Sequence, residues 1–244
     1  MMKGIYIAAS GMNFQINQLS EVTANLANVN TTGYKRTQLV SNTFGDLVTQ
    51  FQNPTPFNRV GMGVTDGGRA RWESQGPLQR TNNPLHVALS GPGYFQVQDN
   101  NGQVVVTRNG DFRLDAQGYM ASQEGARVLG QNNQPIQLAA IATETLRIRQ
   151  DGAIMSGAAE VGRVKVVGPE NADPRTFPAS NAGVPPIADG FTVEQGYLEG
   201  SNVSVINEMV NMITLNKAFT FGQKAITTKD NLLNKTVNDL GRVQ

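Results

Sequence analysis

The chain has no cysteine, one histidine and one tryptophan, and charged residues make up only 16% of its 244 residues. Without cysteine there is no disulfide framework, no thiolate metal site and no cysteine nucleophile. A formal net charge of +1 gives no electrostatic case for binding nucleic acid or an anionic membrane. The composition therefore argues against cysteine-dependent enzymes and against nucleic-acid-binding proteins.

Long apolar runs are also missing. No run approaches the roughly 20 apolar residues that a membrane-spanning helix needs. Near the N-terminus, Asn13, Gln15, Asn17 and Gln18 interrupt the apolar positions, so the apolar core of a secretory signal is not formed. We expect a chain that does not span a membrane and that, if exported, leaves the cytoplasm without a cleaved signal peptide.

The single histidine, His86, lies in a segment of alternating polarity. A metal cluster or a Ser-His-Asp triad would depend on this one residue, with Ser90 and Asp111 as the nearest partners in sequence. A strand histidine that only packs locally is the commoner case. Gly91-Pro92-Gly93 lacks the third glycine and the following helix of a dinucleotide site. We predict no catalytic, metal or cofactor-binding residues and no small-molecule substrate, and therefore no enzyme.

A long helix is predicted over residues 201–244. One row has an apolar residue at every seventh position: Val205, Met212, Phe219, Ile226, Leu233 and Leu240. Met209 lies on the interleaved row, where Asn216, Gln223 and Asp230 are polar. A heptad seam with polar interruptions pairs weakly alone and selects its partner strongly.

A second helix is predicted over residues 1–33. Ile5, Met12, Leu19 and Leu26 again lie seven apart, with Ile16 on the same face. Gly33 suits a left-handed position after the helix. Gly11 costs about 1 kcal/mol relative to Ala, so either a neighbouring helix approaches closely there or the helix is marginal until it packs.

The two helical ends are interpreted as complementary halves of one coiled coil or helical bundle. The alternative is two amphipathic helices packed on a globular core, which usually show a broader apolar stripe.

The middle of the chain is rich in turn residues, with most of the 26 Gly and 11 Pro of the sequence. Residues 34–75 are predicted to form an extended connector with local β pairing and one short helix near Phe44–Phe51. Residues 76–200 are predicted to form an all-β domain. Its expected strands are 86–89, 94–98, 104–107, 111–114, 146–148, 161–167 and 191–198, with Asn-Gly, Gln-Gly and Asp-Gly turns between several of them. The predicted fold class is α+β, with the β domain inserted between two helical ends.

Three parts of the sequence resemble one family. Residues 24–35, ANLANVNTTGYK, resemble the N-terminal signature of the bacterial flagellar axial proteins of the rod and hook. Residues 199–203, EGSNV, and 208–213, EMVNMI, resemble the C-terminal signature. Residues 87–95 and 107–112 resemble motifs of the family's β domain. The likeness covers nearly the whole chain. The length of the chain favours the proximal over the distal rod subgroup.

The resemblance implies a structural subunit of the basal-body rod, which polymerises through its terminal helices into the shaft that transmits torque across the periplasm. It implies other copies, neighbouring rod proteins and the flagellar type III export apparatus as partners, and no cofactor. The implied assembly interface is Ile5, Met12, Ile16, Leu19, Leu26, Val205, Met209, Met212, Phe219, Ile226, Leu233 and Leu240. The family motif residues are Asn25, Leu26, Ala27, Asn28, Thr32, Gly33, Tyr34, Ser201, Asn202, Val203, Glu208 and Met209.

Two other function classes stay open at this stage. The first is a secreted β domain that binds or cleaves glycans and oligomerises through coiled-coil ends; it would need a groove with stacked aromatic residues, and paired carboxylates for hydrolysis. The second is a phage-tail-like or adhesin fibre.

Overall fold

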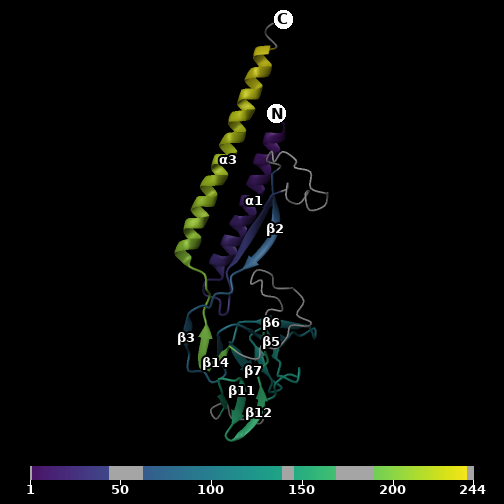
Figure 1. Ribbon diagram of the computed structural model, residues 1–244, viewed down its shortest axis with the longest axis vertical. Coiled ribbons are helices and arrows are strands. Elements are labelled where there is room, and N and C mark those ends of the chain that lie inside the picture. Colours follow the sequence, from purple (N-terminus) through teal and green to yellow (C-terminus); the bar gives the residue numbers. More distant parts are fainter. Residues whose placement is uncertain (1, 44–62, 139–145, 169–189, 241–244) are drawn as a thin grey trace. The chain divides into compact units, whose positions relative to one another are not determined.

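The computed structural model describes residues 2–43, 63–138, 146–168 and 190–240, and its contacts divide the chain into two compact units (Figure 1). The helical unit consists of Met1–Ala27, Thr37–Ala70 and Ser204–Gln244. The β unit consists of Asn28–Arg36 and Arg71–Val203. The α+β fold class, with a helix at each end and a β-rich middle, is confirmed.

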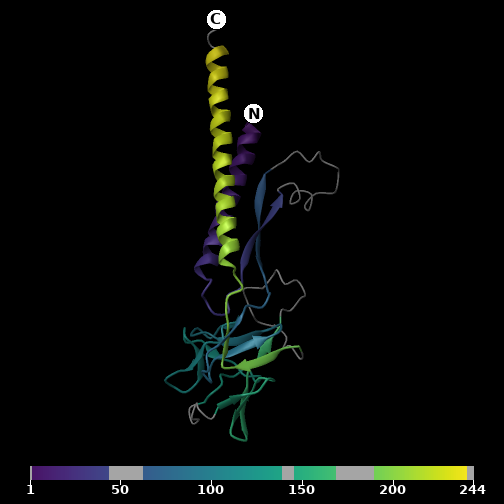
Figure 2. The same ribbon diagram turned by 90° about the vertical axis from the view of Figure 1, so that its left-hand side faces the viewer.

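Two long helices form most of the helical unit: α1 spans Met2–Ala27 and α3 spans Val205–Leu240. The two helices contact one another and run side by side in both views (Figures 1 and 2). Within the described residues, neither helix has the length and apolar character needed to cross a bilayer. α1 ends at Ala27, before the end of the predicted segment 1–33, and α3 begins at Val205, after the start of the predicted segment 201–244. The backbone of the residues in between bonds within the β unit: the Gly33 N–H donates to the Glu199 carbonyl and the Asn202 N–H to the Tyr34 carbonyl.

A two-stranded sheet lies beside α1 and is made of β1 (Thr37–Thr43) and β2 (Val64–Arg71). Asn25 of α1 fixes the start of β1: its side chain donates to the Thr37 carbonyl at 2.7 Å and accepts from the Thr37 N–H at 3.0 Å. Glu21 pairs with Arg69 of β2. The predicted connector thus contains a paired hairpin, while the short helix expected near Phe44–Phe51 lies outside the described residues.

Two glycines in the helices have opposite surroundings. A Cβ at Gly222 of α3 would lie 2.9 Å from Met12 Cγ of α1, closer than ordinary van der Waals contact. A Cβ at Gly11 would meet no described atom within 4 Å. The close helix approach that the sequence suggested at Gly11 occurs instead at Gly222.

The β unit is built from short antiparallel strands. They are β3 (Leu78–Arg80), β4 (Val87–Ser90), β5 (Tyr94–Gln98), β6 (Val104–Thr107), β7 (Phe112–Leu114), β8 (Met120–Ser122), β9 (Arg127–Val128), β10 (Leu146–Ile148), β11 (Ala153–Ser156), β12 (Ala159–Arg163), β13 (Val166–Val167), β14 (Thr192–Gln195) and β15 (Tyr197–Glu199). The main sheet has the order β13-β5-β9-β8-β7, with β6 also paired to β5. β10, β11 and β12 form a second sheet, and β14-β4 and β15-β3 form separate pairs.

One apolar core runs through the β unit. Phe95 of β5 and Phe112 of β7 lie at its centre, with ring centroids 5.3 Å apart in an edge-to-face arrangement. The predicted β domain is therefore present, but two of its expected strands are each divided. Residues 161–167 fall into β12 and β13, and 191–198 into β14 and β15, where Gly196 takes a φ of 78°.

Asn109-Gly110 was expected to turn the chain between strands. Gly110 does not have a positive φ, and the local turn contact is made by Asn109, whose Oδ1 accepts from the Asp111 N–H at 3.0 Å. A Cβ on Gly110 would lie 1.5 Å from the Val87 carbonyl oxygen, so glycine is needed there for a close backbone approach.

The two helical glycines give the first prediction. Gly222→Leu should lower the free energy of unfolding because the new side chain collides with Met12. Gly11→Ala should raise it by about 1 kcal/mol, since alanine favours the helix and meets nothing. Urea unfolding of the monomeric variants, monitored by helical circular dichroism, measures the free energy of unfolding of each. A stabilised Gly222→Leu protein would contradict the packing described.

Candidate functional site

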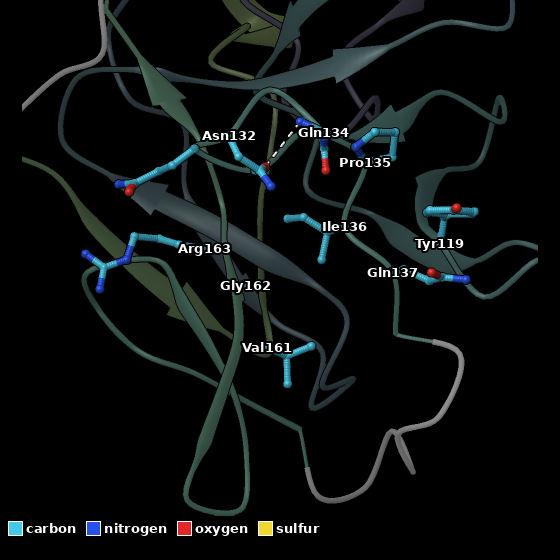
Figure 3. Close-up of a pocket in the computed structure, with 11 residues that line it drawn as sticks. Tyr119, Asn132, Gln134, Pro135, Ile136, Gln137, Val161, Gly162 and Arg163 are labelled. Atoms are coloured by element: carbon cyan, nitrogen blue, oxygen red, sulfur yellow. Dashed lines mark hydrogen bonds between the residues drawn. The ribbon is translucent and has the colours of Figure 1, made fainter.

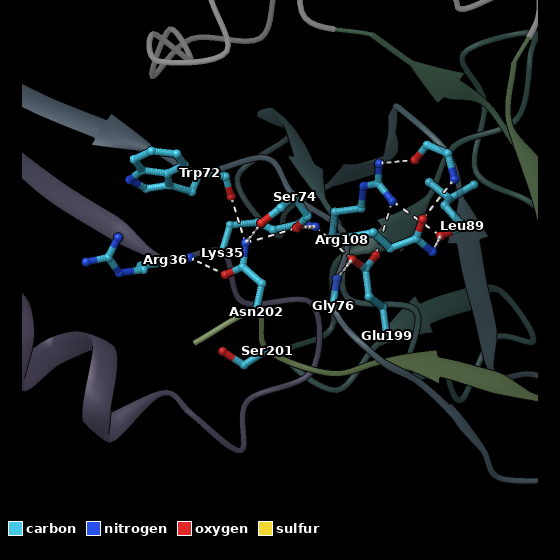
Figure 4. A network of polar contacts seen from close by, with 12 residues as sticks. Lys35, Arg36, Trp72, Ser74, Gly76, Leu89, Arg108, Glu199, Ser201 and Asn202 are labelled. Atoms are coloured by element: carbon cyan, nitrogen blue, oxygen red, sulfur yellow. Dashed lines mark hydrogen bonds and ion pairs between the residues drawn. The ribbon is translucent and has the colours of Figure 1, made fainter. Parts of the chain in front are cut away.

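A buried carboxylate, that of Glu199, lies where distant segments of the β unit meet (Figure 4). One oxygen, Oε1, accepts hydrogen bonds from Lys35 Nζ at 2.7 Å and from the Gly76 N–H at 2.9 Å. The other, Oε2, accepts from Arg108 Nη1 at 3.1 Å. We call Lys35, Gly76, Arg108 and Glu199 the Glu199 cluster. Its carboxylate has two cationic partners and a backbone partner.

Both cations of the cluster are almost fully buried, at 5% exposure for Lys35 and 4% for Arg108. Lys35 Nζ also donates to the Ser74 carbonyl at 2.8 Å, and Arg108 Nη2 donates to the Gly91 carbonyl at 2.6 Å. Burial lowers the pKa of Lys35, while its hydrogen bond to Glu199 acts in the opposite direction. Because buried ions are stable only when their hydrogen bonds are nearly complete, the cluster fixes the segments that carry it.

The backbone around Glu199 is equally constrained. The Gly33 N–H donates to the Glu199 carbonyl at 2.7 Å, and Thr32 Oγ1 donates to Asn109 Oδ1 at 2.8 Å. Gly33 has the predicted left-handed conformation, with a φ of 68°. A Cβ there would lie 2.4 Å from the Asn109 nitrogen, so no other residue fits.

Asn202 joins two further backbone segments (Figure 4). Its Nδ2 donates to the carbonyls of Trp72 and Ser74, each at 2.9 Å, and its Oδ1 accepts from the Arg36 N–H at 2.7 Å. Its own N–H donates to the Tyr34 carbonyl at 3.4 Å. One side chain thus ties residues 34–36 and 72–74 to the segment that follows β15.

The remaining family motif residues in the β unit support the same backbone. Ser201 and Val203 are each 8% exposed, and Ser201 Oγ accepts from the Val203 N–H at 3.2 Å. The Asn28 carbonyl accepts from the Thr31 N–H at 3.1 Å. These contacts order the two segments that enter and leave the β unit.

In the helical unit the family motif residues are buried to different degrees. Asn25 is 1% exposed and Glu208 is fully buried, whereas Leu26 is half-buried and Ala27 is exposed at the end of α1. Met209, next to Glu208, is 48% exposed. The first turn of α3 therefore has an inward polar residue beside an outward apolar one.

The residues predicted as an assembly interface do not all lie on one covered face. Ile16 and Met209 are 50% and 48% exposed. The half-buried members are Ile5, Met12, Leu19 and Leu26 of α1 and Val205, Met212, Phe219, Ile226 and Leu233 of α3. The side chain of Leu240 lies outside the described residues. On α3, the seven-residue row is thus the inner face of the helix, and Met209 lies off it.

His86 makes local contacts with neighbouring polar groups. Its Nδ1 lies 2.9 Å from Thr81 Oγ1, and its Nε2 lies 3.0 Å from Asn83 Nδ2 and 3.2 Å from Asp111 Oδ1. In the part of the chain that the structure describes, no three His, Cys, Asp or Glu side chains are grouped as a metal site would require.

Three family models match the chain, and together they span most of it. "Flagella basal body rod protein" matches residues 5–35, "Flagellar hook protein FlgE/F/G D1 domain" matches 88–156, and "Flagellar basal body rod FlgEFG protein C-terminal" matches 194–240.

Proteins that are similar over nearly the whole chain are also named as flagellar basal-body rod proteins. The flagellar basal-body rod protein FlgG of Agrobacterium fabrum is 33% identical, with 95% of this chain and 97% of that protein covered. FlgG of Buchnera aphidicola is 30% identical, with 96% and 98% covered. The chain belongs to the flagellar basal-body rod proteins of the FlgF/FlgG type. FlgF of Caulobacter vibrioides is 29% identical over the full length of both chains.

The three matched regions meet in the Glu199 cluster. Lys35 comes from the first region, Arg108 from the second and Glu199 from the third. The sequence motifs that carried the resemblance are thus joined in space, within the β unit, by one buried set of ion pairs.

This cluster was not predicted from the sequence, although all three charged residues lie inside the motifs that carry the resemblance. The available signal was a charged residue at the end of an apolar stretch, as at Arg108 after the valines of β6 and Glu199 after Leu198 in β15. Such a residue needs a buried partner of opposite charge. The sequence alone does not say which partner that is.

The second prediction tests the cluster. Glu199→Gln removes the carboxylate that is paired with the buried Lys35 and Arg108, which should lower the free energy of unfolding by about 3–5 kcal/mol. Glu194→Gln, a half-buried position on the adjacent β14, is the control and should change it little. Urea unfolding at pH 7 compares them; equal stability of the two variants would show that the cluster is not needed.

The third prediction concerns pH. Burial raises the pKa of the Glu73 carboxyl above its ordinary 4.5; Arg71, Lys35 and Arg108 oppose this shift and Glu199 adds to it. The protonated carboxyl therefore favours the folded state, and its stabilisation is lost as pH rises through the raised pKa. Glu73→Gln should be more stable than the unsubstituted chain at pH 8, and this difference should shrink on acidification toward pH 4.5. If the urea midpoints of Glu73→Gln and of the unsubstituted chain changed in parallel across that pH range, this prediction would be contradicted.

Proposed function

We propose that this chain polymerises through its terminal helices into the flagellar rod and helps to transmit torque across the periplasm. Membership of the rod protein family makes it a structural component of the basal body. The mode of assembly is our inference. The observation that supports it most directly is that α3 carries apolar side chains on two opposite faces.

The inner face of α3 is occupied within the chain. Phe219 and Ile226 are half-buried on it, and Gly222 lies against Met12 of α1. We propose that α1 and α3 form a coiled-coil pair in this way. The seven-residue row would then hold the two ends of one subunit together, in addition to any role between subunits.

The outer face of α3 remains open to solvent in the single chain. Ile206 is 74% exposed, Val210 56%, Ile213 55% and Phe221 68%, and Met209 lies beside them. Between Ile213 and Phe221 the surface is hollowed by about 520 Å³, with Lys217 and Lys224 at its border. A helix that is apolar on both sides is normally covered on both sides.

We propose that neighbouring rod subunits cover this outer face, defined as Ile206, Met209, Val210, Ile213 and Phe221. Contact between an outer face and a different surface of the next subunit is head-to-tail, and such contacts extend into open helical polymers when they do not close into rings. Tyr6 and Ile16 of α1 are 72% and 50% exposed and extend the apolar surface available to neighbours.

The β unit would give the shaft stiffness. The Glu199 cluster and Asn202 join its first, middle and last segments by hydrogen bonds and ion pairs. We propose the domain division 1–33, 34–75, 76–200 and 201–244 as the functional one, although Asn28–Arg36 belongs to the β unit by its contacts.

The similar proteins do not choose between FlgG and FlgF, because both names occur at about 30% identity with nearly complete coverage. The preference for FlgF rests on chain length and on the run GYLEGSNV at residues 196–203, and it stays a prediction. Family membership does not favour a separate secreted glycan-binding protein or an unrelated fibre.

We extend the proposal to the flagellar type III apparatus as the export route and to an unfolded state in transit. The open apolar face of α3 supports this, because a helix whose second face is uncovered gains its full stability only on assembly.

The fourth prediction separates the two faces of α3. Phe221→Asp should leave the contact between α1 and α3 intact but prevent rod assembly, because a carboxylate would replace an outer contact in every subunit. Ile226→Asp should lose both the contact between α1 and α3 and the assembly of the rod, since it introduces an unpaired charge on the inner face. Swimming of a complemented deletion strain and imaging of its basal bodies read out assembly, and helical circular dichroism of the purified monomer reads out the inner contact.

Gln223→Asp is the matched control, because it adds the same charge at an exposed position on the same part of α3. It should assemble rods almost normally at equal secreted levels. Normal motility with Phe221→Asp would refute the outer face as an assembly surface, while leaving family membership untouched.

A further inference from the structure

A groove of about 620 Å³ lies in the β unit between the 130–137 segment and β12 (Figure 3). Its volume is in the range of small-molecule sites, which is roughly 300–1,000 Å³. Ile136 is buried at its floor beside Gly162, and Tyr119, Pro135 and Val161 add apolar surface. This groove has no part in the polymerisation proposed above.

The strand that forms one wall has an irregularity at the groove. β12 pairs with β11, but the register shifts so that Gly162 lies opposite Ile154 and Glu160 opposite Met155. Val161 between them has no opposite residue, and its side chain is 38% exposed. Such bulges re-aim a side chain and are frequent beside binding sites.

Among the described residues that line the groove, the one cation is Arg163, and it is paired. Its Nε lies 3.3 Å from Glu160 Oε1 and its Nη2 lies 3.5 Å from Asp151 Oδ2. The Tyr119 ring, on another side of the groove, has Arg127 stacked 4.3 Å from its centroid, and Arg127 is itself paired with Asp115 at 2.9 Å. A phosphate or carboxylate ligand would therefore find no available counter-charge.

The backbone of the 130–137 segment is already bonded within the chain. The N–H of Gly130 donates to the Gln134 carbonyl, that of Gln131 to the Arg163 carbonyl and that of Asn133 to the Gly130 carbonyl. The Gln134 N–H donates to Asn132 Oδ1, and the Ile136 N–H donates to the Val128 carbonyl. Pro135 has no N–H. An added peptide strand needs a row of available backbone groups, so this wall is not suited to binding a peptide by strand addition.

The rim instead offers side-chain amides. Gln131, Gln134 and Gln137 are exposed, and none of their amides makes a hydrogen bond with another described residue. Each amide both donates and accepts, which matches hydroxyl and acetamido groups. The rim therefore suits a ligand with many neutral hydrogen-bonding groups, above a floor that suits C–H surface and methyl groups.

We propose that this groove binds an uncharged saccharide chain that carries acetamido groups. Pyranose rings present C–H faces to Ile136, Val161 and Tyr119, while their hydroxyl and acetamido groups bond to the glutamine amides. The acetamido methyl group adds apolar contact that an unsubstituted glucan lacks.

The test uses the full-length chain, with chitotetraose and cellotetraose as probes. Isothermal titration should show chitotetraose binding about tenfold tighter than cellotetraose. Amide chemical shifts of the isotope-labelled chain should move at Tyr119, Gln134, Gln137 and Val161 on addition of chitotetraose.

Gly162→Ile should fill the floor and weaken chitotetraose binding by about tenfold or more. It should fold, because a Cβ at Gly162 meets only Ile136 Cγ2 at 3.6 Å, an ordinary contact, and isoleucine favours strands. Ala159→Ile is the matched control: it adds a bulkier aliphatic side chain to the same strand, does not line the groove and should leave binding unchanged. Thermal unfolding checks the fold of both, and Gln137→Ala provides a second binding variant if Gly162→Ile unfolds.

Chitotetraose binding that is lost in Gly162→Ile or Gln137→Ala and kept in Ala159→Ile supports the proposal. It is overturned by the absence of saccharide binding, by equal affinity for the two saccharides or by shifts confined to residues outside the groove. Rod assembly is not measured in these experiments, so their failure is distinct from failure of the proposed function.

Discussion

The bonding of the Glu199 carboxylate is the constraint on which the β unit depends. Burying this anion and the cations of Lys35 and Arg108 is favourable only if their positions match closely, because each loses its hydration. The match requires the entering segment at Lys35, the end of β6 and the end of β15 to come together. Glycine at positions 33 and 76 follows from the same requirement, because a Cβ at either site would overlap neighbouring backbone.

The helical unit follows a different physical rule. Its inner contact is a modest apolar row with a glycine at the closest approach, while its outer side leaves large apolar residues in water. Such an arrangement is unfavourable in isolation and would become favourable in the polymer that we propose. The β unit, by contrast, has an apolar core and pairs the buried charges of Lys35, Arg108 and Glu199 within one chain. One unit is thus suited to folding alone and the other to assembly.

The sequence was sufficient for the two terminal helices and for the seven strand regions it named, because heptad spacing and two-residue alternation report directly on helices and strands. It also located the family motifs that form the centre of the β unit. It did not predict the short strands β3, β8, β9 and β11. It could not identify the partners of Glu199 or place Gly110 in a close approach, because both depend on contacts between distant segments. Likewise, the period of seven in α3 identified an apolar row, but did not reveal that Ile206, Val210 and Phe221 form a second one on the opposite side.

The ion pair between Lys35 and Glu199 joins residues 164 positions apart in the chain. Closing so large a loop is slow and costs conformational entropy that no local contact returns. Whichever end of the chain emerges first from a ribosome or a narrow channel, the carboxylate and its lysine cannot meet until nearly all of the β unit is present. A partly emerged chain would therefore hold unpaired charges where the core should close, which delays compact folding until the chain is almost complete.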